Sequence, residues 1–254
     1  MTLAAPVHDR GVTTLTLDAP ARRNALSGPL VRALAGALDD CAADDSVRAV
    51  VLTHTGGTFC AGADLTSPPE PAAFVGLMRQ ITALPKPVVA RVTGHVRAGG
   101  LGLLAACDIA VAGAGASFAL TEARLGLAPA VISLTLLPKV DRTAAARYYL
   151  TGERFDAREA ARISLITLAA EGGADGSDGA AEVDKALEPV LDGLRRSSPQ
   201  GLMMSKRLVT ATVLESFDQH TEDLIALSAS LFASEEAGEG MNAFLERRDP
   251  TWVL

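Results

Sequence analysis

Short apolar segments alternate with helix-like segments in the first part of the chain, and this alternation constrains the fold more than any other feature. Four segments predict strands: residues 11–17, 47–53, 88–92 and 109–112. Helices are predicted between them at about 27–40, where Ser27 is a favourable N-cap, and at about 72–84. Strands that are nearly continuous in apolar residues are typical of a parallel or mixed sheet covered by helices. The chain is therefore predicted to have an α/β fold.

The second part of the chain is predicted to be mostly helical, from about residue 144 onward. A connector rich in Gly, Asp and Ala at 171–181 precedes helical stretches predicted at 182–196, at 199–232 with a possible break, and at 235–247. Ser198 before Pro199 is a start signal for the second stretch. We therefore divide the chain into an α/β core at 1–190 and a C-terminal helical module at 191–254.

Charge and composition exclude several classes of protein. The 254 residues carry a net charge of −7 without a clustered basic stripe, which argues against nucleic acid as a partner. The longest apolar run near the middle, residues 98–107, is too short for a membrane span, which needs about 20 residues. Three cysteines without a close pair predict neither a disulfide framework nor a metal site. With no signal-like N-terminus, we expect a cytoplasmic enzyme that acts on a small molecule.

The first motif that carries chemistry is FCAGADL at residues 59–65, directly after a predicted strand and a Gly turn. Small residues let a ligand approach the backbone closely, and free N–H groups at such a turn hold an anion. The alternative is an ordinary turn in which Asp64 caps a helix. Cys60 in this motif is expected to be a buried filler rather than a nucleophile.

The second motif is GHVRAGGLGL at residues 94–103, which opens an apolar helix. Within it, Gly100, Gly102 and Ala105, followed by Glu122 twenty residues beyond Gly102, match the bare dinucleotide fingerprint. A dinucleotide-dependent oxidoreductase is therefore the alternative from another class. Against it, the next strand ends near Ala112, well before Glu122, and no Tyr-x-x-x-Lys pair is present.

Together these motifs resemble the enoyl-CoA hydratase/isomerase (crotonase) family. The resemblance also covers RNALS at 23–27, CDIA at 107–110, FALTEARLGL at 118–127 and AFLERR at 243–248, so that it extends from about residue 10 to 252. It implies a spiral of ββα units followed by helices that mediate trimerisation, in a homotrimer or a dimer of trimers. It further implies an acyl-CoA substrate and no separate cofactor, because CoA arrives as part of the substrate.

The resemblance also implies roles for individual residues. Two backbone N–H groups stabilise an enolate-like oxyanion in this family, and by position these are Ala61 and Gly99. The implied CoA contacts are Arg22, Ala25, Ala63, Asp64 and Leu65, together with Phe244 and Arg247 near the C-terminus. For Arg22 and Arg247 the alternative is a solvated surface charge.

Family hydratases commonly use two glutamates, of which the second corresponds to Glu122 and the first to Gly102. In its apolar surroundings Glu122 is expected to have a raised pKa and to act as a general base, the alternative being an ion pair with Arg124. The glycine leaves several hypotheses open. They are a one-glutamate hydratase, a pocket widened at Gly102 for a branched or carboxylated acyl group that pairs with Arg97, an isomerase that uses Glu122 alone, and a non-catalytic acyl-CoA binder.

Overall fold

The larger of two sheets forms the centre of the molecule in the computed structural model, which describes residues 2–172 and 179–254. Its strand order is β1-β2-β3-β5-β7-β10, and β1 alone is antiparallel to its neighbour. The strands are β1 (Val7–Asp9), β2 (Val12–Leu17), β3 (Ala49–His54), β5 (Val88–Val92), β7 (Ile109–Ala112) and β10 (Leu168–Ala169). The four predicted strands are therefore confirmed, whereas β1 and β10 were not predicted.

A second, smaller sheet has the order β4-β6-β8-β9, in which β4, β6 and β8 are parallel. Its strands are β4 (Thr58–Cys60), β6 (His95–Arg97), β8 (Ser117–Ala119) and β9 (Phe155–Asp156). Each of β3, β5 and β7 is followed along the chain by one strand of the second sheet and then by a helix or helical turn. This repetition is the predicted spiral of ββα units.

Helices cover both faces of the large sheet. On one face, α1 (Gly28–Ala43), α2 (Pro71–Ala83) and α3 (Gly99–Ala106) contribute to the main core. On the other face, α7 (Ala180–Arg196) packs Val183, Leu187 and Leu191 against valines of the sheet. The Ser27 side chain accepts a hydrogen bond from the Leu30 N–H, as its predicted role as N-cap requires. The domain boundary predicted at 190/191 falls inside α7, and the centre of the predicted connector lies outside the described residues.

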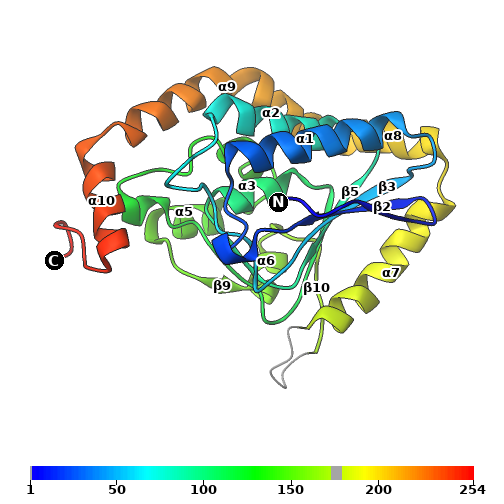
Figure 1. The fold of residues 1–254 in the computed structure, drawn as a ribbon, viewed down its shortest axis with the longest axis horizontal. Coiled ribbons are helices and arrows are strands. Elements are labelled where there is room, and N and C mark those ends of the chain that lie inside the picture. Colours follow the sequence, from blue (N-terminus) through cyan, green and yellow to red (C-terminus); the bar gives the residue numbers. More distant parts are fainter. Residues whose placement is uncertain (1, 173–178) are drawn as a thin grey trace.

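Shorter helical segments link the repeats: η1 (Pro20–Arg22), η2 (Glu122–Leu125), α4 (Ser133–Leu136), α5 (Arg142–Thr151) and α6 (Ala157–Arg162). The chain then ends in α8 (Pro199–Val209), α9 (Ala211–Phe232) and α10 (Glu235–Glu246), so the predicted break in the long helical stretch lies at Thr210. In Figure 1, α9 runs across α2 and leads to α10 at the far end of the molecule, near α5.

A buried lysine attaches these C-terminal helices to the core. Lys206 of α8 forms an ion pair with Asp108 at 2.7 Å and donates a hydrogen bond to the Ile81 carbonyl at 2.8 Å. Both charged side chains are at most 10% exposed, and loss of one partner from such a buried pair leaves an uncompensated charge. Within the described ranges, no helix is both long and apolar enough to cross a membrane.

Candidate active site

The two motifs and the Glu122 segment follow strands of the second sheet at one edge. The turns that follow β4, β6 and β8 begin at Ala61, Ala98 and Leu120, and the carboxyl ends of parallel strands lie at the same edge of a sheet. The Ala98 N–H donates to the Ala119 carbonyl at 3.1 Å, which ties the second turn to the third. The first turn lies close to the second turn, because a Cβ on Gly62 would lie 3.3 Å from the Gly99 nitrogen. The two motifs and the Glu122 segment therefore form one site.

Backbone hydrogen bonding shows which N–H groups of the first turn are available to a ligand. The Ala61 N–H donates to the Arg23 carbonyl at 3.1 Å, and the Asp64 N–H donates to the Leu26 carbonyl at 2.8 Å. The prediction that Ala61 supplies an oxyanion donor is therefore wrong, because that N–H is already used. Within the described part of the chain, the Ala63 N–H between them has no partner.

The second free N–H is that of Gly99, the first residue of α3, whose N–H has no partner within the helix. Ala98 before it has φ 46° and ψ −124°, a backbone conformation that is strained for a residue with a Cβ. The bond from Ala98 to Ala119 and a bond from the Leu101 N–H to the Ala98 carbonyl, at 2.8 Å, hold this conformation. The strained turn directs the start of α3 toward Gly62 and Ala63.

Glu122 begins η2, directly after the third turn. Its Oε2 atom is buried and has no hydrogen-bond partner among the described residues. Burial raises the pKa of Glu122 to about 7, because removal from water disfavours the charged carboxylate. The ion pair with Arg124 does not form: the Arg124 guanidinium instead donates to the Thr151 carbonyl at 2.8 Å. Glu122 is therefore a carboxyl group that can exchange a proton near neutral pH.

The space beside Gly102 is filled, which contradicts the prediction of an open pocket there. A Cβ on Gly102 would lie 2.8 Å from the Ile132 Cβ and 3.0 Å from the Met78 Sδ. The Thr135 hydroxyl also donates to the Gly102 carbonyl at 3.1 Å, which fixes α4 against α3. This position therefore admits neither a wider acyl group nor an added carboxylate without a rearrangement.

The Arg97 side chain is held by Ser117 of the neighbouring strand β8. Its guanidinium donates to the Ser117 carbonyl at 2.5 Å and to the Ser117 hydroxyl at 2.7 Å. The same hydroxyl lies 3.0 Å from Nδ1 of His95. The predicted pairing of Arg97 with a distal carboxylate would require these bonds to break, so the structure does not support it.

The predicted CoA contacts lie in two places. Around the first turn, Arg22 of η1 is exposed and forms an ion pair with Asp64 at 3.5 Å, and Ala25, Ala63 and Leu65 are half-buried beside it. Asp64 does not cap a helix but accepts hydrogen bonds from the backbone and the hydroxyl of Thr66. The other two residues, Phe244 and Arg247, are exposed at the end of α10. Their contact with CoA stays a prediction.

Asn24 is a site-forming residue that the sequence analysis did not interpret, although it lies in the RNALS segment. It is fully buried with φ 50°, and its amide nitrogen donates to the carbonyls of Thr55 and Thr58 at 3.0 and 2.7 Å. Its amide oxygen accepts from the Ala19 N–H at 2.7 Å. Asn24 thereby fixes the loop that contains Arg23, whose carbonyl occupies the Ala61 N–H.

The glycines of the dinucleotide fingerprint serve close packing. Gly100 and Gly102 lie inside α3 rather than in a loop before it, and a Cβ on Gly100 would lie 2.7 Å from the Cys60 carbonyl oxygen. The oxidoreductase alternative is therefore wrong. Cys60 itself is fully buried, and burial raises the pKa of its thiol to about 12, so it is the inert filler that was expected.

The C-terminal helix α10 packs directly on η2, the turn that carries Glu122. A Cβ on Gly240 of α10 would lie 2.5 Å from the Leu125 carbonyl carbon and oxygen. In the other direction, a Cβ on Gly126 would lie 2.6 Å from the Glu236 carbonyl group. Two glycines thus allow backbone-to-backbone contact at this crossing.

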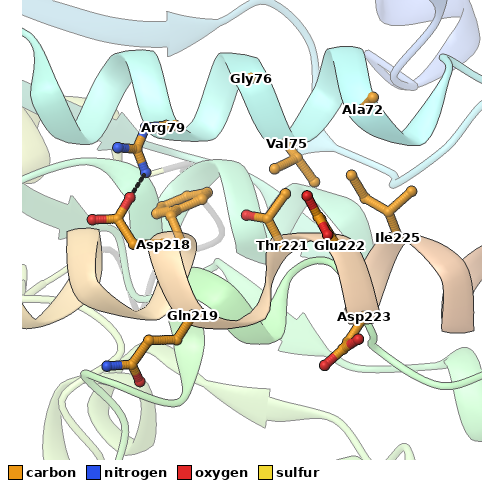
Figure 2. A pocket seen from close by; sticks show the side chains of 11 residues that line it. Ala72, Val75, Gly76, Arg79, Asp218, Gln219, Thr221, Glu222, Asp223 and Ile225 are labelled. Atoms are coloured by element: carbon orange, nitrogen blue, oxygen red, sulfur yellow. Dashed lines mark ion pairs between the residues drawn. The ribbon is translucent and has the colours of Figure 1, made fainter.

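A groove of about 600 Å³ lies on the outer side of α2, between α2 and α9 (Figure 2). Its walls carry the ion pair of Arg79 with Asp218, at 2.8 Å, and the acidic side chains of Glu222 and Asp223. The residues that line the groove include none of the predicted site residues. It is a hollow distinct from the site at the edge of the second sheet.

The spiral of ββα repeats closed by C-terminal helices defines the crotonase fold class. An enoyl-CoA hydratase from Mycobacterium avium has the same fold, with a TM-score of 0.87 and 54% identity over 96% of this chain and 94% of that one. Another enoyl-CoA hydratase, from Mycobacterium tuberculosis, is 33% identical over 98% of this chain and 96% of that protein. The 2,3-dehydroadipyl-CoA hydratase of Escherichia coli is 31% identical over 94% of each chain.

The family model for enoyl-CoA hydratase/isomerase matches residues 8–253. The chain therefore belongs to the enoyl-CoA hydratase/isomerase family.

Proposed function

We propose that this protein is an enoyl-CoA hydratase that adds water across the α,β double bond of a 2-enoyl-CoA thioester. The observation that carries the proposal is the buried, unpartnered Oε2 atom of the Glu122 carboxyl, in the turn that leaves the same sheet edge as the free N–H groups of Ala63 and Gly99. A general base with a pKa of about 7 and an anion-binding pair of donors are what this reaction needs. The names of the related hydratases support the same reaction.

In the proposed reaction, the Glu122 carboxylate takes a proton from water while the water oxygen bonds to Cβ of the substrate. The π electrons move toward the thioester, and the resulting enolate oxygen accepts hydrogen bonds from the Ala63 and Gly99 N–H groups. Glu122 then returns the proton to Cα, and the enolate electrons re-form the thioester carbonyl. The product is a 3-hydroxyacyl-CoA, and no cofactor is consumed.

In this proposal the two N–H donors account for the largest part of the rate, because loss of one oxyanion donor costs about 10²–10³ in kcat in other enzymes. In our proposal the CoA moiety lies along the first turn, where the exposed Arg22 is available to its phosphates. Apolar side chains exposed on the last three helices, among them Leu208, Phe232 and Leu245, support the implied trimer or dimer of trimers. The molar mass in solution, measured by light scattering, tests this assembly.

Replacement of Glu122 by Gln tests the function directly. We expect the parent to hydrate crotonyl-CoA and Glu122→Gln to lose about 10²–10⁴ in kcat, with acyl-CoA affinity changed only a few-fold. Glu153→Gln is the matched control, because it removes a surface carboxylate that is paired with Arg147. A Glu122→Gln enzyme that keeps its rate within a few-fold shows that another group transfers the proton.

An enoyl-CoA isomerase is the second candidate, and one observation favours it. Ile132 occupies the position at Gly102 where a second carboxyl would lie, and one carboxyl is sufficient to move a proton between Cα and Cγ. Assays with a 2-enoyl-CoA and a 3-enoyl-CoA separate the two. If the parent shifts the 3-enoyl double bond and adds water to no 2-enoyl-CoA, it is an isomerase. If it does neither but binds both, it is a non-catalytic binder.

A further inference from the structure

Water bound beside Glu122 needs a second hydrogen-bond acceptor if it is to attack in a fixed orientation. A water molecule has two hydrogens, and Glu122 accepts only the one that is transferred in the proposed reaction. The position of Gly102 supplies no acceptor side chain, and Ile132 and Met78 fill the space beside it with apolar atoms. The second acceptor must therefore come from another element near Glu122.

The last turn of α5 is such an element. The Arg124 guanidinium donates to the Thr151 carbonyl at 2.8 Å, and a Cβ on Gly152 would lie 3.1 Å from the Leu120 carbonyl oxygen. These contacts hold the end of α5 against both flanks of Glu122. The side chain of Tyr149 projects from this turn and is half-buried against the core. Burial, and to a smaller extent the charge of the Glu122 carboxylate, raises the pKa of Tyr149 to about 12, so the phenol is neutral at working pH.

A chain of hydrogen bonds determines the direction in which the Tyr149 hydroxyl donates. The Ser133 hydroxyl is buried and donates its one hydrogen to the Pro129 carbonyl at 2.6 Å. The Tyr149 hydroxyl lies 3.0 Å from the Ser133 Oγ, so it must be the donor in that contact. The lone pairs of the Tyr149 oxygen are consequently left to accept a hydrogen from another molecule.

We propose that Tyr149, held by Ser133, accepts the second hydrogen of the water that Glu122 deprotonates and thereby orients its lone pair toward Cβ of the substrate. This assignment rests on the proposed hydration reaction. It gives Tyr149 the water-positioning task that no side chain at Gly102 can perform. In the product, the same contact joins the new 3-hydroxyl group to the Tyr149 oxygen.

The test compares Tyr149→Phe with Tyr148→Phe. Tyr148 is the matched control because its hydroxyl donates to Glu159 at 2.7 Å, outside the site. For hydration of crotonyl-CoA we expect Tyr149→Phe to lower kcat about 10- to 100-fold with KM changed only a few-fold, because misplaced reactants cost rates of that order. Tyr148→Phe is expected to keep the parent kcat. An unchanged kcat for Tyr149→Phe overturns the proposal.

A binding experiment separates failure of this proposal from failure of the proposed function. Affinities for 3-hydroxybutyryl-CoA and butyryl-CoA are measured by calorimetry in Glu122→Gln and in Glu122→Gln/Tyr149→Phe, so that neither thioester turns over. We expect the double variant to lose about 3- to 10-fold in affinity for 3-hydroxybutyryl-CoA, the value of one neutral hydrogen bond, and none for butyryl-CoA. Equal effects on both ligands overturn the role of Tyr149 even if the parent is a hydratase. Loss confined to the hydroxylated ligand supports the contact even if the parent proves to be an isomerase.

Discussion

Replacement of Gly240 by Ala probes the contact between the C-terminal helix and the turn that carries the general base. The new Cβ would lie 2.5 Å from the Leu125 carbonyl oxygen, whereas ordinary carbon contacts begin at about 3.5 Å. Helix α10 and η2 must therefore separate by about 1 Å. Because Glu122 begins η2, the same shift moves the carboxyl relative to the Ala63 and Gly99 N–H groups.

The expected effects on stability and on catalysis differ in size. Overpacking costs about 1–3 kcal/mol, but Ala is favoured over Gly inside a helix by about 1 kcal/mol, so the net loss in the free energy of unfolding is about 0–2 kcal/mol. A misplacement of about 1 Å costs about 10²-fold in rate. We therefore expect Gly240→Ala to remain folded and to lose about 10²-fold in kcat for crotonyl-CoA.

Gly238→Ala is the matched control on the same helix, because a Cβ there meets no atom within 4 Å. We expect this variant to keep the parent kcat and to gain up to about 1 kcal/mol of stability. Urea denaturation and steady-state kinetics of both variants make the comparison. A Gly240→Ala enzyme with kcat within threefold of Gly238→Ala would falsify the conclusion that α10 sets the position of Glu122.

Two further predictions concern the same site. The folded-state pKa of Glu122, about 7, exceeds its ordinary value of 4.5. The contribution of Glu122 to the free energy of unfolding is therefore fully present below pH 4.5 and is lost as pH rises through 7. Relative to Glu122→Gln, the parent is expected to lose up to about 3 kcal/mol of unfolding free energy between pH 4.5 and pH 7 and above. Over the same range, kcat/KM of the parent for hydration is expected to rise with an apparent pKa near 7. Identical pH profiles of stability for the two proteins contradict the burial argument. Gly102→Glu is expected to lower the activity and to lower the free energy of unfolding by about 1–3 kcal/mol, because the new side chain meets Ile132 and Met78. Adding Ile132→Gly is expected to restore stability, and a single Gly102→Glu variant more active than the parent shows that the pocket rearranges.

Local signals in the sequence were sufficient for the large elements of the fold. Ser27 marks the start of α1, Ser198 and Pro199 mark the start of α8, and the continuous apolar segments give β3, β5 and β7. The second sheet escaped prediction because its strands have only two or three residues, too few to show a period of two. The spiral itself came from the family resemblance, since periodicity does not encode how strands of two sheets alternate.

The candidate site was predictable in its positions but not in its detailed chemistry. The structure places Gly62 of the first motif against Gly99 of the second, and it ties the second motif to the segment before Glu122 through the bond from Ala98 to Ala119. The use of the Ala61 N–H by the Arg23 carbonyl depends on a loop that is fixed by Asn24, far from Ala61 in the sequence. Likewise, Ile132 fills the space beside Gly102, and Tyr149 interacts electrostatically with Glu122. Such contacts between distant segments leave no local pattern in the sequence.

The contact of α10 with η2 has a consequence for the order in which the site is assembled during synthesis. A chain is delivered from its N-terminus at about 5–20 residues per second. The turns that carry Ala63 and Gly99 are therefore complete long before residues 235–246 leave the ribosome. Until then the close contact of α10 with the η2 backbone at Leu125 and Gly126 is missing. The nascent protein thus acquires its anion-binding turns first, and the contact of α10 with the segment that carries its general base is among the last to form.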